Sequence, residues 1–178
     1  MEFDINNNPV LAIIFQRKSV RNFTGGEVSD EQLQMLLKAA MAAPSAVNQQ
    51  PWEFVVVRDR HILDCLADEL PYAKMLYKAS AAVIVCGNPE KAHLKLTEYA
   101  VIDATLASQN MLLAAESLGL GAIWTAAYPY DDRIAIVRKY TGIPKNIIPL
   151  NVIPVGIPVG VDKPKEKFDQ SKIHHGKW

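Results

Sequence analysis

Cysteine is scarce in this sequence, and neither sign of charge is in excess. The 178 residues include two cysteines, Cys65 and Cys86, and neither stands in a CxxC or Cys/His spacing. Both lie among apolar residues, so we expect buried free thiols and a reducing compartment. Lysine plus arginine equals aspartate plus glutamate at 19 each, which argues against the overall positive field of a nucleic-acid-binding or membrane-surface protein. A site for an anion must therefore be local.

Targeting signals and long unbroken apolar runs are also missing. Residues 1–8 (MEFDINNN) have neither the basic start nor the apolar centre of a signal peptide. The longest apolar segment, residues 99–120, contains polar side chains such as Asp103 and Glu116, which make it a poor membrane span. Hydrophobic residues form 49% of the chain and charged residues 21%, a globular composition. We expect a soluble cytoplasmic protein that forms a single domain, residues 1–178, with an extended tail over residues 159–178.

The common catalytic motifs are absent as well. The sequence has no GxGxxG or GxxxxGK[ST] nucleotide loop, no GxSxG elbow and no HExxH zinc motif. The four histidines are scattered along the chain: His61, His93, His174 and His175. We therefore expect no metal ion and no catalytic side chain, so that a cofactor must supply the chemistry if the chain is an enzyme.

Apolar spacing predicts helices and strands that mix without a strict βαβ repeat. Helices are predicted over residues 9–17, 29–43, 59–70, 97–120 and 131–143, and strands over residues 52–59, 79–88 and 121–127. Asn8 before Pro9 resembles an N-cap, and Ser29 with Gln32 forms a capping box. Residues 146–160 are apolar but contain three prolines, Pro149, Pro154 and Pro158, which suits an edge or irregular strand. The pattern predicts an α+β or three-layer αβα fold.

The predicted helix over residues 97–120 is apolar on nearly every side. Alanines such as Ala100, Ala104 and Ala107 permit close approach of neighbouring elements. A helix that is apolar all round must be buried on all sides. In a domain of this size a second subunit can cover the remaining face, so we expect a homodimer.

Residues 17–23 (RKSVRNF) carry three cations in a chain of zero net charge. Arg17 and Arg21 can offer planar, bidentate donors, Lys18 adds a point charge, and the Ser19 hydroxyl adds a short donor. Such a set can bind a phosphate group. A solvated turn is the alternative that this stretch alone leaves open.

Two further polar stretches pose the same choice. In residues 44–52 (PSAVNQQPW), the side chains of Ser45, Asn48 and Gln50 lie between two stiffening prolines and could read the edge of a planar heterocycle. Lys165 and Lys167 would point to one side of an extended segment. A polar turn and a solvated lysine-rich terminus are the respective alternatives.

Taken in order, these stretches resemble the FMN-dependent nitroreductase family over residues 17–167. The resemblance rests on RKSVRNF, PSAVNQQPW, a helix ending in LGLGAIWT, and PVGIP followed by PKEK. It implies a three-layer αβα sandwich with a mixed central sheet, an intertwined homodimer, and FMN at each subunit interface.

The resemblance also assigns residues to the FMN site. It implies a phosphate and ribityl site made by Arg17, Lys18, Ser19, Arg21, Lys165 and Lys167. It implies a loop that reaches FMN from the partner subunit, with Pro44, Ser45, Asn48 and Gln50. A backbone amide within residues 125–127 is expected near the flavin, where this chain has Ala126 and Ala127 in place of a frequent Glu-Gly pair. Aromatic candidates for the pocket wall are Tyr72, Tyr77, Trp124 and Tyr128.

The activity implied is transfer of electrons from NADH or NADPH, through bound FMN, to a small oxidised acceptor such as a nitroaromatic, a quinone or a flavin, with ping-pong kinetics. The sequence does not identify the acceptor or the preferred nicotinamide. Two alternatives stay open: an FMN-binding protein for storage or regulation without turnover, and a related flavin chemistry such as reductive dehalogenation or flavin cleavage. The zero net charge argues against a nucleic-acid module built on RKSVR.

Overall fold

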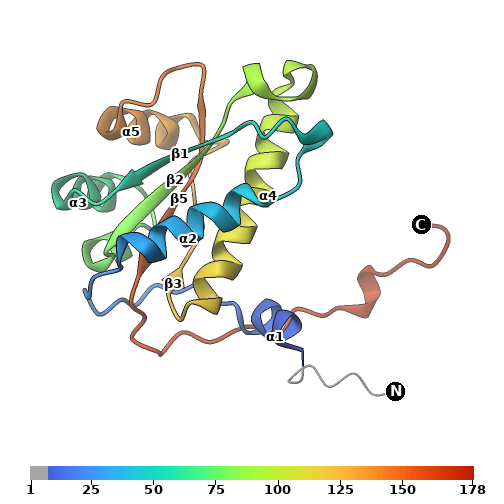
Figure 1. Ribbon diagram of the computed structural model, residues 1–178, viewed down its shortest axis with the longest axis horizontal. Helices are drawn as coiled ribbons and strands as arrows, with labels where there is room; N and C mark the ends of the chain where they lie inside the picture. The colour runs from blue at the N-terminus through green and yellow to red at the C-terminus, as the bar shows by residue number, and fades with distance from the viewer. Residues whose placement is uncertain (1–7) are drawn as a thin grey trace.

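The computed structural model describes residues 8–178 of the chain (Figure 1). The helices are α1 (Pro9–Gln16), α2 (Asp30–Met41), α3 (Arg60–Glu69), α4 (Thr97–Ser117) and α5 (Asp131–Thr141). The strands are β1 (Trp52–Val57), β2 (Ala81–Gly87), β3 (Gly121–Ala122), β4 (Thr125–Ala126) and β5 (Ile148–Gly156). Short 3-10 turns include η2 (Ala46–Asn48), η3 (Lys74–Lys78) and η6 (Gln170–Lys172). Most of the N-terminal stretch that lacks the features of a signal peptide, residues 1–7, lies outside the described residues.

The helices begin within one residue of their predicted starts and end one to three residues before their predicted ends. The Asn8 side chain accepts hydrogen bonds from the backbone N–H groups of Val10 and Leu11 at the start of α1. Ser29 and Gln32 form the expected capping box at α2. Gly142, at φ 69°, ends α5 in the left-handed conformation that glycine adopts without strain. These terminal hydrogen bonds confirm the predicted starts of α1 and α2.

The described strands form an antiparallel sheet in the order β1-β2-β5-β3, with β4 also paired to β5. The α+β class is confirmed, but the expectation of a mixed sheet is wrong for this part of the chain. Strands β2 and β3 run in the same direction, as their connection through α4 would allow. Strand β5 lies between them and is antiparallel to both, so no parallel ladder forms.

Strand β5 is central and buried, whereas its prolines predicted an edge or irregular strand. Pro149 lies at the register shift opposite Val85 and Cys86, where the regular ladder is interrupted. Strands β3 and β4 pair with β5 in the same register, but the pairing is interrupted between them. Pro154 lies opposite this interruption. Proline cannot donate to a ladder, so it is tolerated where the ladder already lacks a bond. The edges of the sheet are β1 on one side and β3 with β4 on the other. The middle residues of β1 are partly exposed rather than buried.

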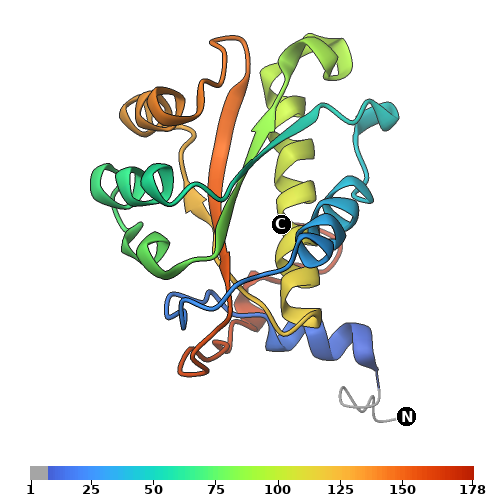
Figure 2. The ribbon, with the colours of Figure 1, turned by 60° about the vertical axis from the view of Figure 1, so that its left-hand side comes forward.

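Helices cover both faces of the sheet, as Figure 2 shows. Alternate residues of β2 point to opposite faces: Ala81, Val83 and Val85 belong to the core beneath α2 and α4, and Ala82, Ile84 and Cys86 to the core beneath α3 and α5. The structure thus has the predicted three αβα layers.

The C-terminal segment leaves β5 and passes close to α1 (Figure 1). Residues 159–178 contain only the short turn η6. Between residues 8 and 178, no helix is long and apolar enough to cross a membrane.

Candidate functional site

The RKSVRNF stretch is held against the sheet, although its sequence also allowed a solvated turn. The Val20 amide donates to the Ala122 carbonyl at 3.1 Å. Val20 and Phe23 are buried. Their side chains occupy the space that a side chain at Gly121 or Gly156 would need. The polar residues between these two anchors therefore have a fixed position.

The C-terminal segment pairs with the same stretch. The Thr24 amide donates to Ile157, and the Val159 amide donates to Asn22, each at 2.9 Å. Beyond that pairing, Asp162 Oδ2 accepts hydrogen bonds from the backbone amides of Arg21 and Asn22, each at 3.3 Å. This pairing brings residues 163–167 beside residues 17–21, which are far away in sequence.

The two segments enclose a hollow of about 380 Å³, which we call the cationic hollow. Its lining residues are Arg17, Lys18, Ser19, Arg21, Val161, Asp162, Lys163, Lys165 and Lys167. All six residues predicted for the phosphate and ribityl site are among them. Lys163 was not predicted, although the alternate spacing of Lys165 and Lys167 extends to it and could have indicated it.

Lys18 differs from the other cations of the hollow. Its ammonium forms a 2.6 Å salt bridge with Glu116 Oε1 of α4, and both side chains are largely buried. The charge of Lys18 is therefore partly neutralised within the chain. Arg17, Arg21 and the lysines of residues 163–167 carry the charge that the hollow offers to an anion.

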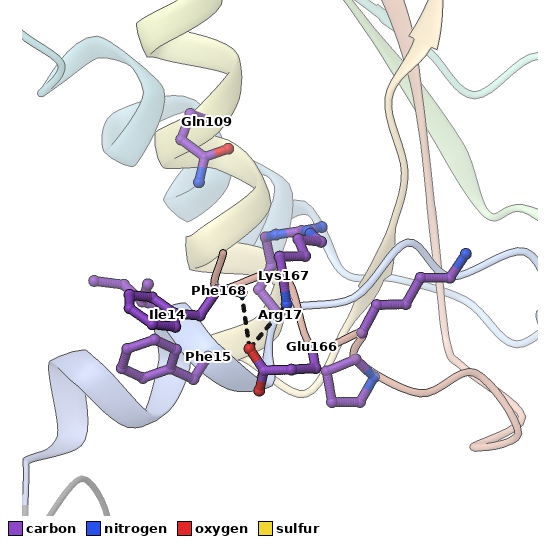
Figure 3. Close-up of a pocket in the computed structure, with 9 residues that line it drawn as sticks. Ile14, Phe15, Arg17, Gln109, Glu166, Lys167 and Phe168 are labelled. Atoms are coloured by element: carbon purple, nitrogen blue, oxygen red, sulfur yellow. Dashed lines mark hydrogen bonds between the residues drawn. The ribbon is translucent and has the colours of Figure 1, made fainter. Parts of the chain in front are cut away.

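A larger hollow of about 710 Å³ adjoins the first and shares Arg17, Lys165 and Lys167 with it. Figure 3 shows the apolar side chains of Ile14, Phe15 and Phe168 beside Arg17 and Lys167. The carboxylate of Glu166 accepts hydrogen bonds from the amides of Lys167 and Phe168 at 2.9 Å, which lower the pKa of Glu166. The two backbone bonds favour the ionised form of Glu166, so this hollow contains one carboxylate beside the cations Arg17, Lys165 and Lys167.

A third hollow, of about 240 Å³, lies at the edge of β4. It is lined by Arg21, Pro71, Tyr72, Ile123, Trp124, Thr125, Ala126 and Arg133. Thr125 Oγ1 and Arg133 Nε are buried and have no hydrogen-bond partner within residues 8–178. Arg21 lines both this hollow and the cationic hollow, so the two hollows are neighbours.

The two alanines expected near the flavin have different environments. Ala126 is half-buried and borders the β4 hollow. Ala127 is fully buried, and its amide donates to the Leu150 carbonyl at 3.0 Å. Within the predicted range 125–127, the Ala127 amide is therefore already bonded to the adjoining part of β5. Ala126 is the remaining candidate of the two.

The loop with Pro44, Ser45, Asn48 and Gln50 lies away from the cationic hollow of the same chain. Its Ala46 amide donates to Asp103 near the start of α4, whereas Lys18 of the hollow pairs with Glu116 near the end of α4. Glu116 lies thirteen residues beyond Asp103 along α4, a distance of about 20 Å at 1.5 Å per residue. One chain therefore does not bring all the predicted site residues together.

The arrangement fits a flavin mononucleotide better than a metal ion. A group of cations and a serine hydroxyl suits a phosphate, and unpartnered polar atoms at the β4 edge suit a heterocycle with donors and acceptors. Within residues 8–178, no cluster of three or more histidine, cysteine or acidic side chains could hold a metal ion.

Comparisons with known proteins identify the family. The model of the "Nitroreductase family" matches residues 14–80 and 66–160. A "Putative NADH dehydrogenase/NAD(P)H nitroreductase" of Methanothermobacter thermautotrophicus is 41% identical over 98% of this chain and 90% of its own length. A crystal structure with the same description, from Bacteroides thetaiotaomicron, is 51% identical, with a TM-score of 0.91 over 96% of this chain and 99% of the other.

A third relative was solved with a flavin. It is a "putative nitroreductase in complex with fmn" from Desulfovibrio desulfuricans, 31% identical, with a TM-score of 0.80 over 92% of this chain and 94% of the other. The fold, the site and these matches together define an oxidoreductase. The chain belongs to the nitroreductase family.

Proposed function

We propose that the protein uses bound FMN to transfer electrons from NADH or NADPH to a small oxidised acceptor. The cationic hollow carries this proposal, because a local group of cations in a neutral chain suits the phosphate of a mononucleotide. The relatives' names support it, since they combine NAD(P)H nitroreductases with an FMN complex. A nitroaromatic, a quinone or a free flavin is the class of acceptor proposed.

The roles of the chain's own residues follow from their positions. Arg17, Arg21, Lys165 and Lys167 would hold the phosphate, with Ser19 adding a neutral donor. Ala126 and the unpartnered atoms at the β4 edge would meet the flavin ring. When bound, FMN supplies the hydride and electron chemistry, which explains why the protein needs no catalytic acid, base or nucleophile. Donor and acceptor would use the same exposed face in turn, which gives ping-pong kinetics.

A homodimer completes the proposed site. Ser45, Asn48 and Gln50 are too far along α4 to reach the cationic hollow of their own chain, so we place them at the hollow of the partner. The exposed apolar side chains of α4 support this arrangement: Ile102 is 52% exposed and Leu106 is 37% exposed. Nothing in the proposal needs nucleic acid or a membrane, and we place the protein in the cytoplasm.

The phosphate assignment is tested by Arg17→Ala together with Arg21→Ala. Charge-assisted hydrogen bonds contribute about 1.5–3 kcal/mol each, so FMN affinity should fall by about a hundredfold or more. Equilibrium titration of flavin fluorescence measures the affinity, and circular dichroism checks the fold. The matched control removes two exposed cations elsewhere, Lys38→Ala with Lys145→Ala, and should bind FMN as the unaltered protein does. Full flavin retention in the double arginine variant would refute the assignment.

Turnover is tested by anaerobic bleaching of the flavin with NADH or NADPH, followed by reoxidation with a nitroaromatic or a quinone. Both half-reactions should proceed. A protein that binds FMN but is not reduced by either nicotinamide would instead have a storage or regulatory role. Reduction without reoxidation by these acceptors would direct the search to a related flavin chemistry, such as dehalogenation.

A further inference from the structure

Asp103 is a buried carboxylate that the proposed chemistry does not use. It lies on α4 and is 2% exposed. Its Oδ1 accepts a hydrogen bond from the Ala46 amide at 3.1 Å, whereas its Oδ2 is buried without a partner in residues 8–178. Burying a carboxylate with so few hydrogen bonds is costly. The position of Asp103 therefore calls for an explanation beyond packing.

The segment that Asp103 contacts has an unusual backbone. Val47, Asn48 and Gln50 have positive φ angles of 49°, 57° and 51°. Asparagine tolerates this region, but a β-branched residue such as Val47 rarely adopts it. Strained residues of this kind persist only where surrounding structure holds them, and they cluster at functional sites.

The hydrogen bonds of residues 45–50 are otherwise internal. The Asn48 amide donates to the Ser45 carbonyl and the Gln50 amide to Ser45 Oγ, each at 3.0 Å. Among the described residues, the bond from Ala46 to Asp103 is the one hydrogen bond that joins this segment to another element. Asp103 thus connects a self-contained, strained turn to the rigid helix α4.

The turn presents polar groups in a defined arrangement. Gln50 Nε2 donates to Asn48 Oδ1 at 3.0 Å, and both side chains are exposed. This bond leaves Asn48 Nδ2 and Gln50 Oε1 without partners in residues 8–178, so the turn offers an amide donor group and a carbonyl acceptor. A rigid donor and acceptor bind a heterocycle more tightly than a mobile pair, because less side-chain and backbone freedom is lost on binding.

From these contacts we infer that Asp103 is a positioning residue for FMN. It holds the Ser45–Gln50 turn in its left-handed conformation through the Ala46 amide, and it acts on the cofactor only through that turn. The inference rests on the proposed function, because it takes this turn as part of an FMN site.

The test compares Asp103→Ala with Asp103→Asn. Asparagine keeps the Oδ1 acceptor for the Ala46 amide, whereas alanine removes it. In the cofactor-free protein, hydrogen exchange at the Ala46 amide should be at least about tenfold faster in Asp103→Ala than in the unaltered protein, and nearly unchanged in Asp103→Asn. FMN affinity should fall by about tenfold or more in Asp103→Ala and change by less than about threefold in Asp103→Asn.

A second substitution separates positioning from general stability. Glycine adopts positive φ without strain, so Val47→Gly in the Asp103→Ala background should recover part of the FMN affinity. A purely structural role for Asp103 would lower the thermal midpoint without this recovery. Asp132→Ala, which removes an exposed aspartate from α5, is the control for charge and should leave both readouts unchanged. Asp103→Ser replaces Asp103→Ala if the alanine variant does not fold.

The outcomes distinguish this inference from the proposed function. Equal FMN affinity in all the Asp103 variants, or continued protection of the Ala46 amide in Asp103→Ala, would overturn the inference alone. A failure of the unaltered protein to bind FMN would overturn the proposed function, and with it the positioning role of Asp103.

Discussion

At the scale of single residues, the two cysteines have different environments. Both were expected to be buried, and Cys86 is, but Cys65 on α3 is partly exposed. Burial, with a smaller contribution from the nearby charge of Glu53, raises the pKa of Cys86 to about 12. The reactive form of a cysteine is the thiolate, so Cys86 should be inert at neutral pH.

This difference predicts the thiol titration of the native protein. At pH 8, a group with a pKa of about 12 is about one ten-thousandth thiolate, so a disulfide reagent such as dithiobis-nitrobenzoate should titrate one fast thiol per chain. The second thiol should react only after denaturation. Cys65→Ser should remove the fast phase, and two fast equivalents in the unaltered protein would contradict the burial of Cys86.

The site residues were predictable where the signal lies in the chain itself. The cations of residues 17–21 and the alternating lysines near residue 165 could be found from their spacing. The pairing of Lys18 with Glu116 could not, because the two residues are 98 positions apart and meet only in the folded protein. The hydrogen bond from the Ala127 amide to the Leu150 carbonyl could not be predicted either, because it depends on how the strands pair.

At the scale of elements, two glycines position the RKSVRNF stretch. A Cβ added at Gly121 would lie 2.6 Å from Val20 Cγ1 and 2.8 Å from Phe23 Cε1, and one added at Gly156 would lie 2.8 Å from Phe23 Cδ1. These separations are too short for carbon atoms in contact. The close packing of Val20 and Phe23 on β3 and β5 therefore depends on glycine. This packing also positions the cations of the same stretch, which line the cationic hollow.

Gly121→Ala should displace the stretch and weaken the site as well as the fold. We expect a loss of about 1–3 kcal/mol in the free energy of unfolding, typical of overpacking, together with weaker FMN binding. Urea denaturation and flavin titration measure the two effects. The compensating variant Gly121→Ala with Val20→Ala removes the shortest contact, the one with Val20 Cγ1, and should recover part of the stability and of the FMN affinity.

Gly26→Ala is the matched control for this substitution. Its added methyl would meet only side-chain atoms of Thr24 and Ile157, at 3.2 Å and 3.3 Å, so FMN affinity should be nearly unchanged. Equal FMN binding in Gly121→Ala and the unaltered protein would show that the cations do not depend on this packing.

Elements were predicted best where local hydrogen bonds define them. The capping residues Asn8 and Ser29 identified helix starts correctly, since a cap needs only its own first turn. Strand β5 was misplaced because the effect of Pro149 and Pro154 depends on which ladder bonds the neighbouring strands form. That information is not local, and no spacing within residues 146–160 contains it.

At the scale of the whole molecule, one chain leaves an apolar surface uncovered. Ile102 and Leu106 lie one helical turn apart on α4 and are exposed, and so are Ile14 and Phe15 of α1. A groove of about 490 Å³ between α1, α2 and α4 has a largely apolar lining that includes Ile13, Leu113 and Ala114. Exposed apolar side chains and an apolar groove are typical of a protein–protein interface. The organisation of residues 1–178 as a single domain with an extended tail stays a prediction.

The proposed dimer and the proposed FMN site should be lost together. Ile102→Glu with Leu106→Glu places charges on the exposed face of α4, and like charges brought together in an apolar interface are unfavourable. We expect a mass near that of one 19.7 kDa chain, in place of twice that value, by light scattering. Bound flavin should be released on gel filtration, because each hollow would lose the turn that its partner contributes. Dilution of the unaltered protein should release FMN in parallel with dissociation.

Val56→Glu is the control for the added charge, since Val56 is an exposed apolar residue of the edge strand β1, in another part of the molecule. That variant should remain dimeric and keep its flavin. A monomer that retains one FMN per chain would contradict the prediction that the partner contributes to the FMN site. In that case Arg17, Arg21 and the lysines of residues 163–167 would be sufficient without Ser45, Asn48 and Gln50. The separation of about 20 Å along α4 would then mean that the turn serves another purpose.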